Sequence, residues 1–578
     1  MNGVFEARLR RTATTTRTSK SDGRELTVSN TIAIIETKFN YNALDRLHYP
    51  SFVGIERRIE GSIGYVIFEV VSVNPTHYQM LGMDVSMPTL LRKEYLDTIN
   101  ESWGTSQETW IDLGAIPTWY ITKFENDDVR FEHTRFVPLA GARVHLLSKK
   151  AVQRFLCYED GESAGNMIGF DLPLRIRMEN LVRYHSGLFG FTGAGKSNLT
   201  SSLVRKAMNL DKELAVVVFD VAGEYPVHLL DLLDSGGRII SNETFEDAEH
   251  FYNSQTVPES LEEEVGATKI RGALERIYNA GVVQKLSLQE STGLDLAWIQ
   301  QLLERTVSDA KAGGTTAKIA LEKLSRVFYG KHRLQPGTRI ADLDGDAKAE
   351  LVALLRDIHD RSHEKSGLRI EVEQLLAELE VPVSAEEDVG PTPEKIAYEI
   401  ATGRTARLTI LYLPEPVAAR IAAGRMIERL LYLRKKIGSK GRILVVLDEA
   451  QEYIPDNPTE KNYTMSSNYA VEKLLRQGRK YRVHCWLATQ RVAHLNVSAL
   501  QQLHSYFVST LPRMYDRMVV ADSFALPYEV LERSAQLETG EWIFVSYKAT
   551  KQKNVPVFLE TANNESIIAE YLRSRRTD

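Results

Sequence analysis

The sequence is poor in cysteine, in long apolar runs and in net charge. Its 578 residues include only Cys157 and Cys485. Two isolated cysteines cannot form a disulfide framework or a cysteine-rich metal cluster, so we expect a reducing, cytoplasmic environment. No apolar run approaches the ~20 residues that cross a bilayer, so we expect no membrane anchor. Residues 1–25 have no apolar core and do not fit a signal peptide.

The charge balance restricts how this protein could bind nucleic acid. The chain has 71 basic and 77 acidic residues, a net charge of −6. The molecule as a whole is therefore weakly repelled by a phosphate backbone. Any contact with nucleic acid must use basic residues that are gathered locally, for example along a channel.

Composition and periodicity divide the chain into five segments. Residues 1–30 are rich in Thr, Arg and Ser and predict a flexible basic tail. Residues 31–150 contain short β-branched and aromatic runs, such as TIAIIETKF, which predict a small β-barrel or sandwich. Residues 151–240 and 401–578 alternate buried-strand runs with helices, as a parallel α/β core does. Residues 241–400 show apolar residues at helical spacing and predict a helical insertion.

The segment GFTGAGKSN fits G-x-x-x-x-G-K-[ST], a loop that binds nucleotide phosphates through backbone N–H groups. It follows the apolar run SGLFG and precedes the helical pattern SNLTSSLVRKAM, so it has the required strand–loop–helix context. We expect Lys196 to reach the β- and γ-phosphates of ATP and Ser197 to bind Mg²⁺. The predicted nucleotide-binding residues are Gly190, Thr192, Gly193, Ala194, Gly195, Lys196, Ser197 and Asn198.

A second motif, RILVVLDEA, places two carboxylates after an apolar strand. Ligands of open α/β sheets bind at the carboxyl ends of the strands. We expect Asp448 to hold Mg²⁺ and Glu449 to orient and deprotonate the attacking water. An acidic pair after a strand can also be only a helix cap, but its presence beside a phosphate loop favours ATP hydrolysis.

Two further segments supply candidates for contacts with the γ-phosphate. The run VHCWLATQR ends a predicted strand at Gln490, which could sense this phosphate or could be an ordinary surface amide. In EKLLRQGRKYR, either Arg476 or Arg479 could be an arginine finger for a neighbouring subunit, or both could be cations at a helix end. The basic run LRKKIGSKGR, residues 433–442, could face a channel, a partner or, by default, solvent.

The segments FGFTGAGKSN, FDVAGEYP, VVLDEAQEYIP and LLRQGRKYRVHCWLATQR occur in this order. Together they resemble the HerA-type hexameric DNA translocases of the FtsK/HerA group, over roughly residues 30–560. The resemblance implies an α/β fold: a RecA-like P-loop NTPase core with an N-terminal β-barrel and a helical insertion. It also implies that Asp220 and Glu224 lie near the nucleotide. Gln451 stands where many members of the group carry His after DEA.

The resemblance further implies a function. It predicts a homo-hexameric ATPase that uses ATP and Mg²⁺ to move on double-stranded DNA, partnered with a nuclease or another effector enzyme. The alternative is an ATP-binding hexameric platform that assembles and activates an effector, with little motor activity. The lack of a membrane anchor disfavours a secretion or conjugation motor. A GTPase switch is disfavoured because the sequence has no Asn-Lys-x-Asp segment to read guanine.

Overall fold

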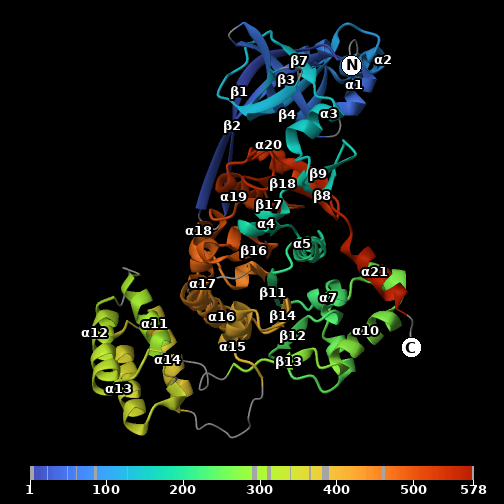
Figure 1. Cartoon of the computed structure of the whole chain (residues 1–578). Helices are drawn as coiled ribbons and strands as arrows, with labels where there is room; N and C mark the ends of the chain where they lie inside the picture. The colour runs from blue at the N-terminus through green and yellow to red at the C-terminus, as the bar shows by residue number, and fades with distance from the viewer. Residues whose placement is uncertain are drawn as a thin grey trace. The chain divides into compact units, whose positions relative to one another are not determined.

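The computed structural model describes residues 5–575 apart from 22–23, 48–49, 60, 84–86, 126–127, 289–295, 309–313, 337, 339, 364–365, 381–389, 439–440 and 459–462. The chain divides into two compact units (Figure 1). The first comprises residues 1–211 and 486–564, and the second comprises residues 212–485 and 565–578. Within the described residues, no helix combines the length and apolar character that a membrane crossing requires.

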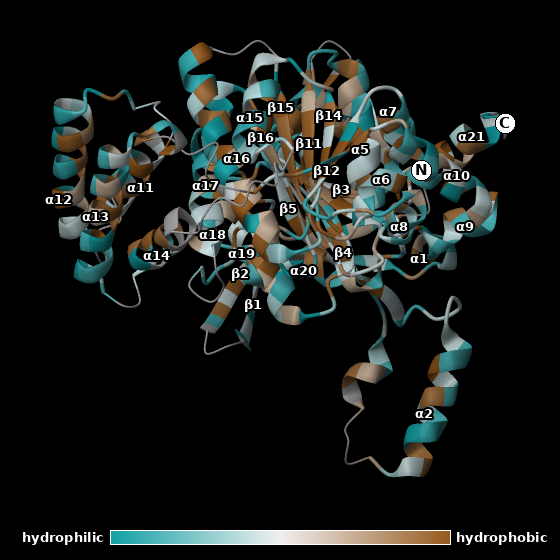
Figure 2. Ribbon diagram, turned by 90° about the horizontal axis from the view of Figure 1, so that it is seen from below, coloured by the Kyte–Doolittle hydropathy of each residue, from teal (hydrophilic) through white to brown (hydrophobic). Residues whose placement is uncertain are grey.

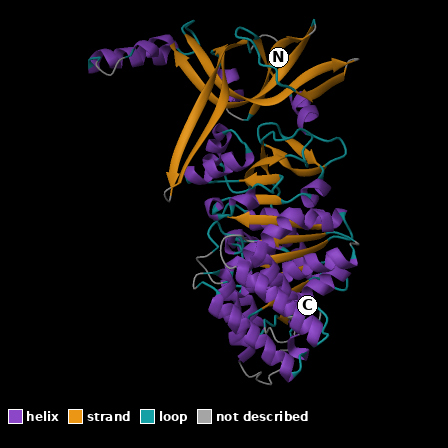
Figure 3. Cartoon of the chain, turned by 90° about the vertical axis from the view of Figure 1, so that its left-hand side faces the viewer, coloured by secondary structure: helices purple, strands orange, loops and turns teal. Residues whose placement is uncertain are grey.

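The first unit begins with an antiparallel sheet of seven strands in the order β2-β1-β7-β3-β4-β5-β6. Strand β2 also pairs with β5. The cycle of pairings is therefore closed and includes β2, β1, β7, β3, β4 and β5. Their alternating inward residues make one apolar core, which includes Ile35, Val53 and Leu113. The strands, orange in Figure 3, are β1 (Ala7–Ser21), β2 (Arg24–Lys38), β3 (Ser51–Ile59), β4 (Ser62–His77), β5 (Thr109–Glu125), β6 (Asp128–His133) and β7 (Arg143–Leu146).

The prediction of a flexible tail over residues 1–30 is wrong for most of that segment. Strands β1 and β2 pair along their length as a hairpin; residues 1–4 and 22–23 lie outside the described part of the chain. The physical reason is that threonine is β-branched and favours strands. Cross-strand hydroxyl pairs join Thr16 to Ser29 and Thr18 to Thr27, each at 3.0 Å. The polar residues of this segment do not mark disorder; they form the exposed surface of a two-stranded hairpin.

The rest of the first unit is a second, mixed sheet. Its order is β16-β10-β17-β18-β19-β8-β9, and β10 is parallel to both of its neighbours. Its strands are β8 (Glu162–Met167), β9 (Leu172–Ile176), β10 (Ser186–Phe189), the end of β16 (Val483–Thr489), β17 (Ser505–Val508), β18 (Glu541–Ser546) and β19 (Val557–Glu560). The unit's helices are α1 (Tyr41–Leu47), α2 (Thr89–Ser102), α3 (Lys149–Leu156), α4 (Met178–Arg183), α5 (Lys196–Leu210), α18 (Val497–Leu500), α19 (Met514–Phe524) and α20 (Tyr528–Glu532).

The second unit has a parallel sheet in the order β13-β12-β14-β11-β15. These strands are β11 (Ala215–Asp220), β12 (Arg238–Ser241), β13 (Val283–Lys285), β14 (Leu408–Tyr412) and β15 (Ile443–Leu447). The central strands are brown in Figure 2, because a parallel strand covered on both faces is a continuous apolar run. The helices are α6 (Tyr225–His228), α7 (Leu230–Asp234), α8 (Ala248–Asn253), α9 (Glu259–Val265), α10 (Ala267–Asn279), α15 (Pro393–Thr402), α16 (Pro416–Ile437), α17 (Thr464–Gln477) and most of α21 (Asn564–Ser574). The predicted α/β class is confirmed.

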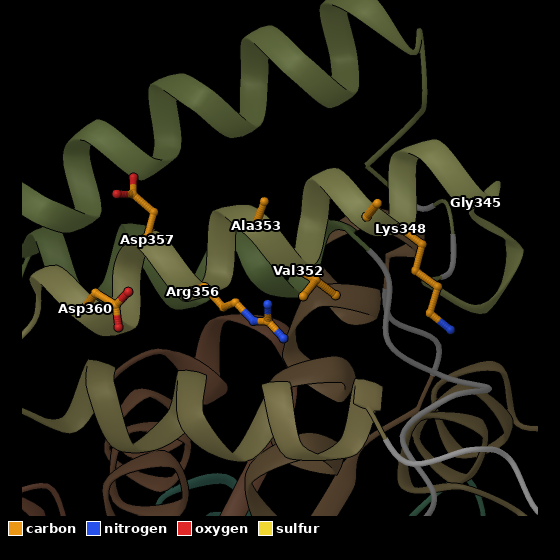
Figure 4. A pocket seen from close by; sticks show the side chains of 8 residues that line it. Gly345, Lys348, Val352, Ala353, Arg356, Asp357 and Asp360 are labelled. Carbon is orange, nitrogen blue, oxygen red and sulfur yellow. The ribbon is translucent and has the colours of Figure 1, made fainter.

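Four helices of the second unit form a separate apolar core. They are α11 (Leu296–Ser308), α12 (Gly314–Leu324), α13 (Gly345–Arg361) and α14 (Gly367–Glu380). The sequence placed a helical insertion at residues 241–400, but β13 lies inside that range and pairs with β12. A cavity of about 730 Å³ runs along α13 between Gly345 and Asp360 (Figure 4). None of the predicted site residues lines it.

A buried carboxyl in strand β4 makes the stability of the first unit depend on pH. Glu69 is 1% exposed, and burial raises its pKa to about 8, although Arg533 opposes this shift. The unfolded chain releases this proton near the ordinary pKa of glutamate, so the folded state binds more protons between about pH 4.5 and 8. The contribution of Glu69 to stability is therefore present at low pH and is lost as the pH rises through this window.

We expect Glu69→Gln to raise the thermal unfolding midpoint at pH 8 and to change it little at pH 5, because the amide never ionises. The difference at pH 8 should correspond to up to a few kcal/mol. Thermal unfolding across this pH range measures it. Glu132→Gln, which alters an exposed carboxylate of the same sheet, is the matched control. A stabilisation that is equal at both pH values would contradict the assignment.

Candidate active site

The phosphate loop connects β10 to α5 in the first unit. Gly193 and Gly195 have φ values of +81° and +90°, a left-handed conformation that strains any residue with a Cβ. A Cβ on Gly190 would lie 3.1 Å from Ser509 Cβ and 3.2 Å from Ala194 Cβ. The loop therefore needs glycine at all three positions, for its backbone path at two and for space at the third.

Two donors of the loop converge on one oxygen. The carbonyl of Phe191 accepts a hydrogen bond from the Ala194 N–H at 3.2 Å and from Lys196 Nζ at 3.4 Å. Lys196 and Ser197 are only 9% and 8% exposed, and they start helix α5. A helix N-terminus and an ammonium group both favour an anion. A phosphate oxygen would be a stronger acceptor for these donors than a neutral carbonyl.

The loop is held from outside by a turn that no sequence motif marks. Thr539 Oγ1 donates to the Gly193 carbonyl at 3.2 Å, and the Gly540 N–H donates to the Ala194 carbonyl at 3.4 Å. The C=O and N–H of a trans peptide point in opposite directions. These contacts therefore turn the N–H groups of Ala194 and Gly195 away from the outer turn, as phosphate binding requires.

Helix α5 is also anchored to the C-terminal part of the unit. The Asn198 side chain donates to Asn563 Oδ1 at 2.5 Å and accepts from the Asn564 N–H at 2.8 Å. Arg205, 7% exposed, donates to Asn564 Oδ1 at 3.1 Å. The sequence grouped Asn198 with the nucleotide-binding residues; these bonds give its side chain an anchoring role.

Gln490 and Thr192 lie side by side in the first unit. Gln490 follows the last residue of β16, and β16 runs parallel to β10. The Thr192 hydroxyl donates to Gln490 Oε1. The predicted sensor amide is thus in direct contact with the predicted phosphate loop.

The carboxylate pair follows β15 in the second unit. Asp448 is 3% exposed, and its N–H donates to the Phe219 carbonyl at 3.1 Å. Glu449 has a φ of +47°, an uncommon conformation for a residue other than glycine. Its Oε2 accepts a hydrogen bond from Gln451 Nε2 at 2.7 Å. Gln451, the departure noted in the sequence, therefore orients the proposed catalytic carboxylate.

Asp220 ends β11, the strand next to β15, so it lies at the same edge of the sheet as Asp448. It is completely buried, and its carboxylate accepts hydrogen bonds from the N–H groups of Ala222, Gly223 and Tyr225 at 2.8–3.1 Å. Burial raises the pKa of Asp220 to about 7, although the backbone donors oppose the shift. Asp220 thus shapes the turn that carries Glu224.

Sequence reasoning missed the groups that support the segment after Glu449. Tyr453 is fully buried and packs edge-on against Phe219, with ring centroids 5.7 Å apart. Burial, and then the charge of Asp448, raises the pKa of the Tyr453 hydroxyl well above its ordinary value. Arg420, 4% exposed, forms an ion pair with Glu452 at 2.5 Å and bonds to its carbonyl at 3.0 Å. The sequence signal that could have identified Arg420 is an arginine within an alanine-rich helical segment.

The two candidate arginine fingers lie at the other end of the strands. Arg476 is exposed and forms an ion pair with Glu472 at 2.5 Å. Arg479 is exposed in the 3₁₀ turn η6 (Gly478–Tyr481), just before β16. The Ile443 N–H donates to the Arg482 carbonyl at 2.9 Å, so this turn lies beside the first residue of β15. The carboxylate pair follows the last residue of β15, roughly 16 Å farther along the strand.

Comparison with known proteins gives a consistent family. The family model described as "Helicase HerA, central domain" matches residues 163–368. The DNA double-strand break repair helicase HerA of Saccharolobus solfataricus is 20% identical over 398 residues, which cover 67% of this chain and 66% of the relative, just under two thirds of its length.

Two solved structures are also similar. VirB4 of Thermoanaerobacter pseudethanolicus is 14% identical, with 71% of this chain and 99% of that chain covered and a TM-score of 0.42. B204, the DNA-packaging ATPase from Sulfolobus turreted icosahedral virus, is 10% identical, with 65% and 98% covered and a TM-score of 0.27. Both scores are below 0.5.

The residues that the family model matches include the first two of the four motifs, FGFTGAGKSN and FDVAGEYP. The loop glycines and the convergence on the Phe191 carbonyl have the features of a phosphate cradle. The comparisons therefore support a P-loop NTPase of the HerA/FtsK type.

Proposed function

We propose that this protein is an ATP-dependent translocase or helicase of double-stranded DNA. In this proposal it works as a homo-hexameric ring with a partner nuclease or another effector enzyme. The observation that carries the ATPase part is the convergence of the Ala194 N–H and Lys196 Nζ on a single acceptor. The DNA and partner parts of the proposal rest on the similarity to HerA. They transfer the function of that relative to this chain.

In this proposal, ATP hydrolysis uses both the phosphate loop of the first unit and the carboxylates that follow β15 in the second unit. The Ser197 hydroxyl and the Asp448 carboxylate are hard oxygen ligands, which Mg²⁺ prefers. Among the described residues, no group of three His, Cys, Asp or Glu side chains could hold a metal alone. This fits Mg²⁺ held by one or two protein oxygens together with substrate phosphates. When bound, the ion would neutralise charge on the β- and γ-phosphates.

In this site the chain's own groups have separate tasks. Lys196 and the loop N–H groups bind and orient the phosphates. Glu449, positioned by Gln451, accepts the proton of the attacking water. Gln490, positioned by Thr192, orients the water or the γ-phosphate. Asp220 keeps its turn folded, and Glu224 on that turn contacts the nucleotide or its bound water.

The position of the basic turn supports the proposed ring. Arg476 and Arg479 are at the amino end of the strands, whereas Glu449 is at the carboxyl end. That edge is opposite the one that carries the carboxylates of the same subunit. We propose that the turn instead contacts the nucleotide of the neighbouring subunit. In the same proposal, the closed N-terminal sheet, which includes β1, corresponds to the barrel domain. Helices α11–α14 correspond to the helical insertion.

We expect Glu449→Gln to keep ATP binding but to lose turnover by roughly 10²-fold or more, because it removes the general base and keeps the phosphate cradle. Lys196→Ala should instead weaken binding, because it deletes a charged contact with phosphate. Calorimetry with ATP and steady-state phosphate release separate the two effects. Near-normal turnover of Glu449→Gln would show that the base is misassigned.

We expect Arg479→Ala to reduce ATP turnover strongly while nucleotide affinity stays near normal, because a finger acts mainly on the transition state. Arg476→Ala should have a smaller effect, since its side chain is already paired with Glu472. Mixing the Arg479 variant with the Glu449 variant should restore part of the activity at interfaces that contain both intact groups. If exchanging subunits recover nothing, Arg479 is not a finger that acts between subunits.

We expect duplex binding to be independent of sequence and strongly dependent on salt, because a motor must contact phosphates and not base edges. Affinities for unrelated duplexes should agree within a few-fold and fall as a power of the salt concentration. Linear duplex DNA should also stimulate the ATPase. DNA-independent turnover together with a stable effector complex would favour the assembly platform.

A further inference from the structure

The hairpin of β1 and β2 extends past the sheet to which it belongs (Figure 3). Strand β1 pairs with β7 only at Ala7 and Arg8, and β2 pairs with β5 only over residues 33–38. Among the described strands, residues 11–21 and 24–31 pair only with each other and form a two-stranded ribbon. Such a ribbon is at best marginally stable by itself in water. Its position therefore depends on what it contacts outside the sheet.

One carboxylate from the core of the same unit holds this ribbon. Thr15 and Asn30 lie opposite each other on the two strands. The Thr15 hydroxyl donates to Glu529 Oε1 at 2.5 Å, and the Asn30 amide donates to Glu529 Oε2 at 2.9 Å. Glu529 is 9% exposed and lies in the first turn of α20. Because a carboxylate accepts at both oxygens, one side chain ties both strands to this helix.

A second contact with the N-terminal sheet follows in the next turn of the chain. Arg533 begins the 3₁₀ turn η8 (Arg533–Gln536), and its Nη1 donates to the Val70 carbonyl of β4 at 3.5 Å. Its guanidinium also lies over the Phe558 ring, 4.7 Å from the centroid. The start of the segment 529–540, which we call the connecting segment, is thus held against β4 as well as against the ribbon.

The other end of the connecting segment reaches the phosphate loop. Thr539 and Gly540 bond to two carbonyls of that loop. The Leu537 carbonyl accepts a hydrogen bond from the Thr510 hydroxyl at 2.8 Å, and the Thr510 carbonyl accepts one from the Phe191 N–H at 2.9 Å. The segment therefore contacts the loop directly at its outer turn and, through Thr510, at its first part.

Phosphate binding would change the loop at this same place. The Phe191 carbonyl accepts a hydrogen bond from Lys196 Nζ at 3.4 Å. In a loop of this type the lysine binds the phosphates, so its ammonium must leave this carbonyl when nucleotide enters. The residue that loses this bond is the one whose N–H is tied to Thr510.

We propose that the connecting segment transmits the position of the ribbon to the phosphate loop, and that Glu529 is a positioning residue for ATP. This rests on the proposed binding of ATP by this loop. Helix α20 and turn η8 cover residues 528–536, so most of the segment is helical and a displacement at one end reaches the other. Coupling between two sites is reciprocal. A clamp that favours ATP binding is therefore itself stabilised by ATP.

The first test removes the clamp from either side. Glu529→Ala should raise the KM for ATP about fivefold or more, within the usual range of such coupling, and should change kcat less than about twofold. Thr15→Ala combined with Asn30→Ala removes the same contact from the ribbon and should have the same effect. Glu529→Gln keeps one acceptor oxygen and should fall between the natural protein and Glu529→Ala.

Glu532→Ala is the matched control, because it removes an exposed carboxylate from the same helix. Its KM should stay within about twofold of the natural value. The double variant of Glu529→Ala and Thr539→Ala tests the route. If both act through the connecting segment, the second change should raise the KM less than about twofold beyond the first. Changes that act independently would instead multiply their effects.

Hydrogen exchange of the ribbon gives a readout that a merely structural clamp would not move. In the natural protein, ATP should slow amide exchange in residues 11–21 and 24–31, although they lie outside the phosphate loop. Thr539→Ala should lose this slowing even at ATP concentrations that saturate it, because the segment is released at its far end. The first measurement needs no variant, so it stands even if Glu529→Ala does not fold.

Three results would overturn the proposal. They are equal exchange of the ribbon with and without ATP, an unchanged KM in a folded Glu529→Ala variant, and effects of Glu529→Ala and Thr539→Ala that multiply. A natural protein that binds no ATP in calorimetry would instead remove the proposed function itself. Calorimetry on the natural protein thus distinguishes the two failures.

Discussion

The direction of the parallel strands is the constraint on which the site depends. A polar residue that follows a buried strand reaches the carboxyl edge of its sheet, and one that precedes it reaches the opposite edge. Asp220, Asp448 and Gln490 follow strands, whereas the turn from Arg479 to Arg482 precedes one. A single chain therefore separates the groups that would attack the γ-phosphate from the arginines that would stabilise it. In the proposed ring, a second copy would supply the missing edge.

The sequence predicted the parts of the site that are local to a motif. The glycine spacing of the phosphate loop and the apolar strand before Asp448 report backbone shape directly, and the structure shows the left-handed glycines and the buried strand that they imply. The polar tail was misread because threonine is both hydrophilic and β-branched. Only the pairing partner, β2, decides between a solvated tail and a ribbon, and pairing across a hairpin is not a compositional property.

The supports of the site could not be predicted, because they join residues that are remote in sequence. Thr539 and Gly540 hold the phosphate loop from outside, and Asn563 and Asn564 anchor helix α5. Each is an ordinary polar residue in an ordinary turn, so its own neighbours carry no signal. In the same way, Gln451 was visible only as a departure from a family pattern until its bond to Glu449 gave it a task. Such contacts depend on the fold, so they can be identified only from the structure.

Two charged residues of the core, Glu449 and Arg482, have left-handed backbones at opposite ends of neighbouring strands. Positive φ does not by itself identify function, since Trp119 and Ala525 share it. Asp171 and Arg333 share it as well, so a charged side chain on a left-handed backbone is not enough. For Glu449 the second observation is its place directly after β15, beside the buried Asp448. Strain persists where the surrounding structure over-determines it. Here backbone hydrogen bonds close both turns: the Glu452 N–H donates to the Glu449 carbonyl at 2.8 Å, and the Arg482 N–H donates to the Arg479 carbonyl at 3.3 Å.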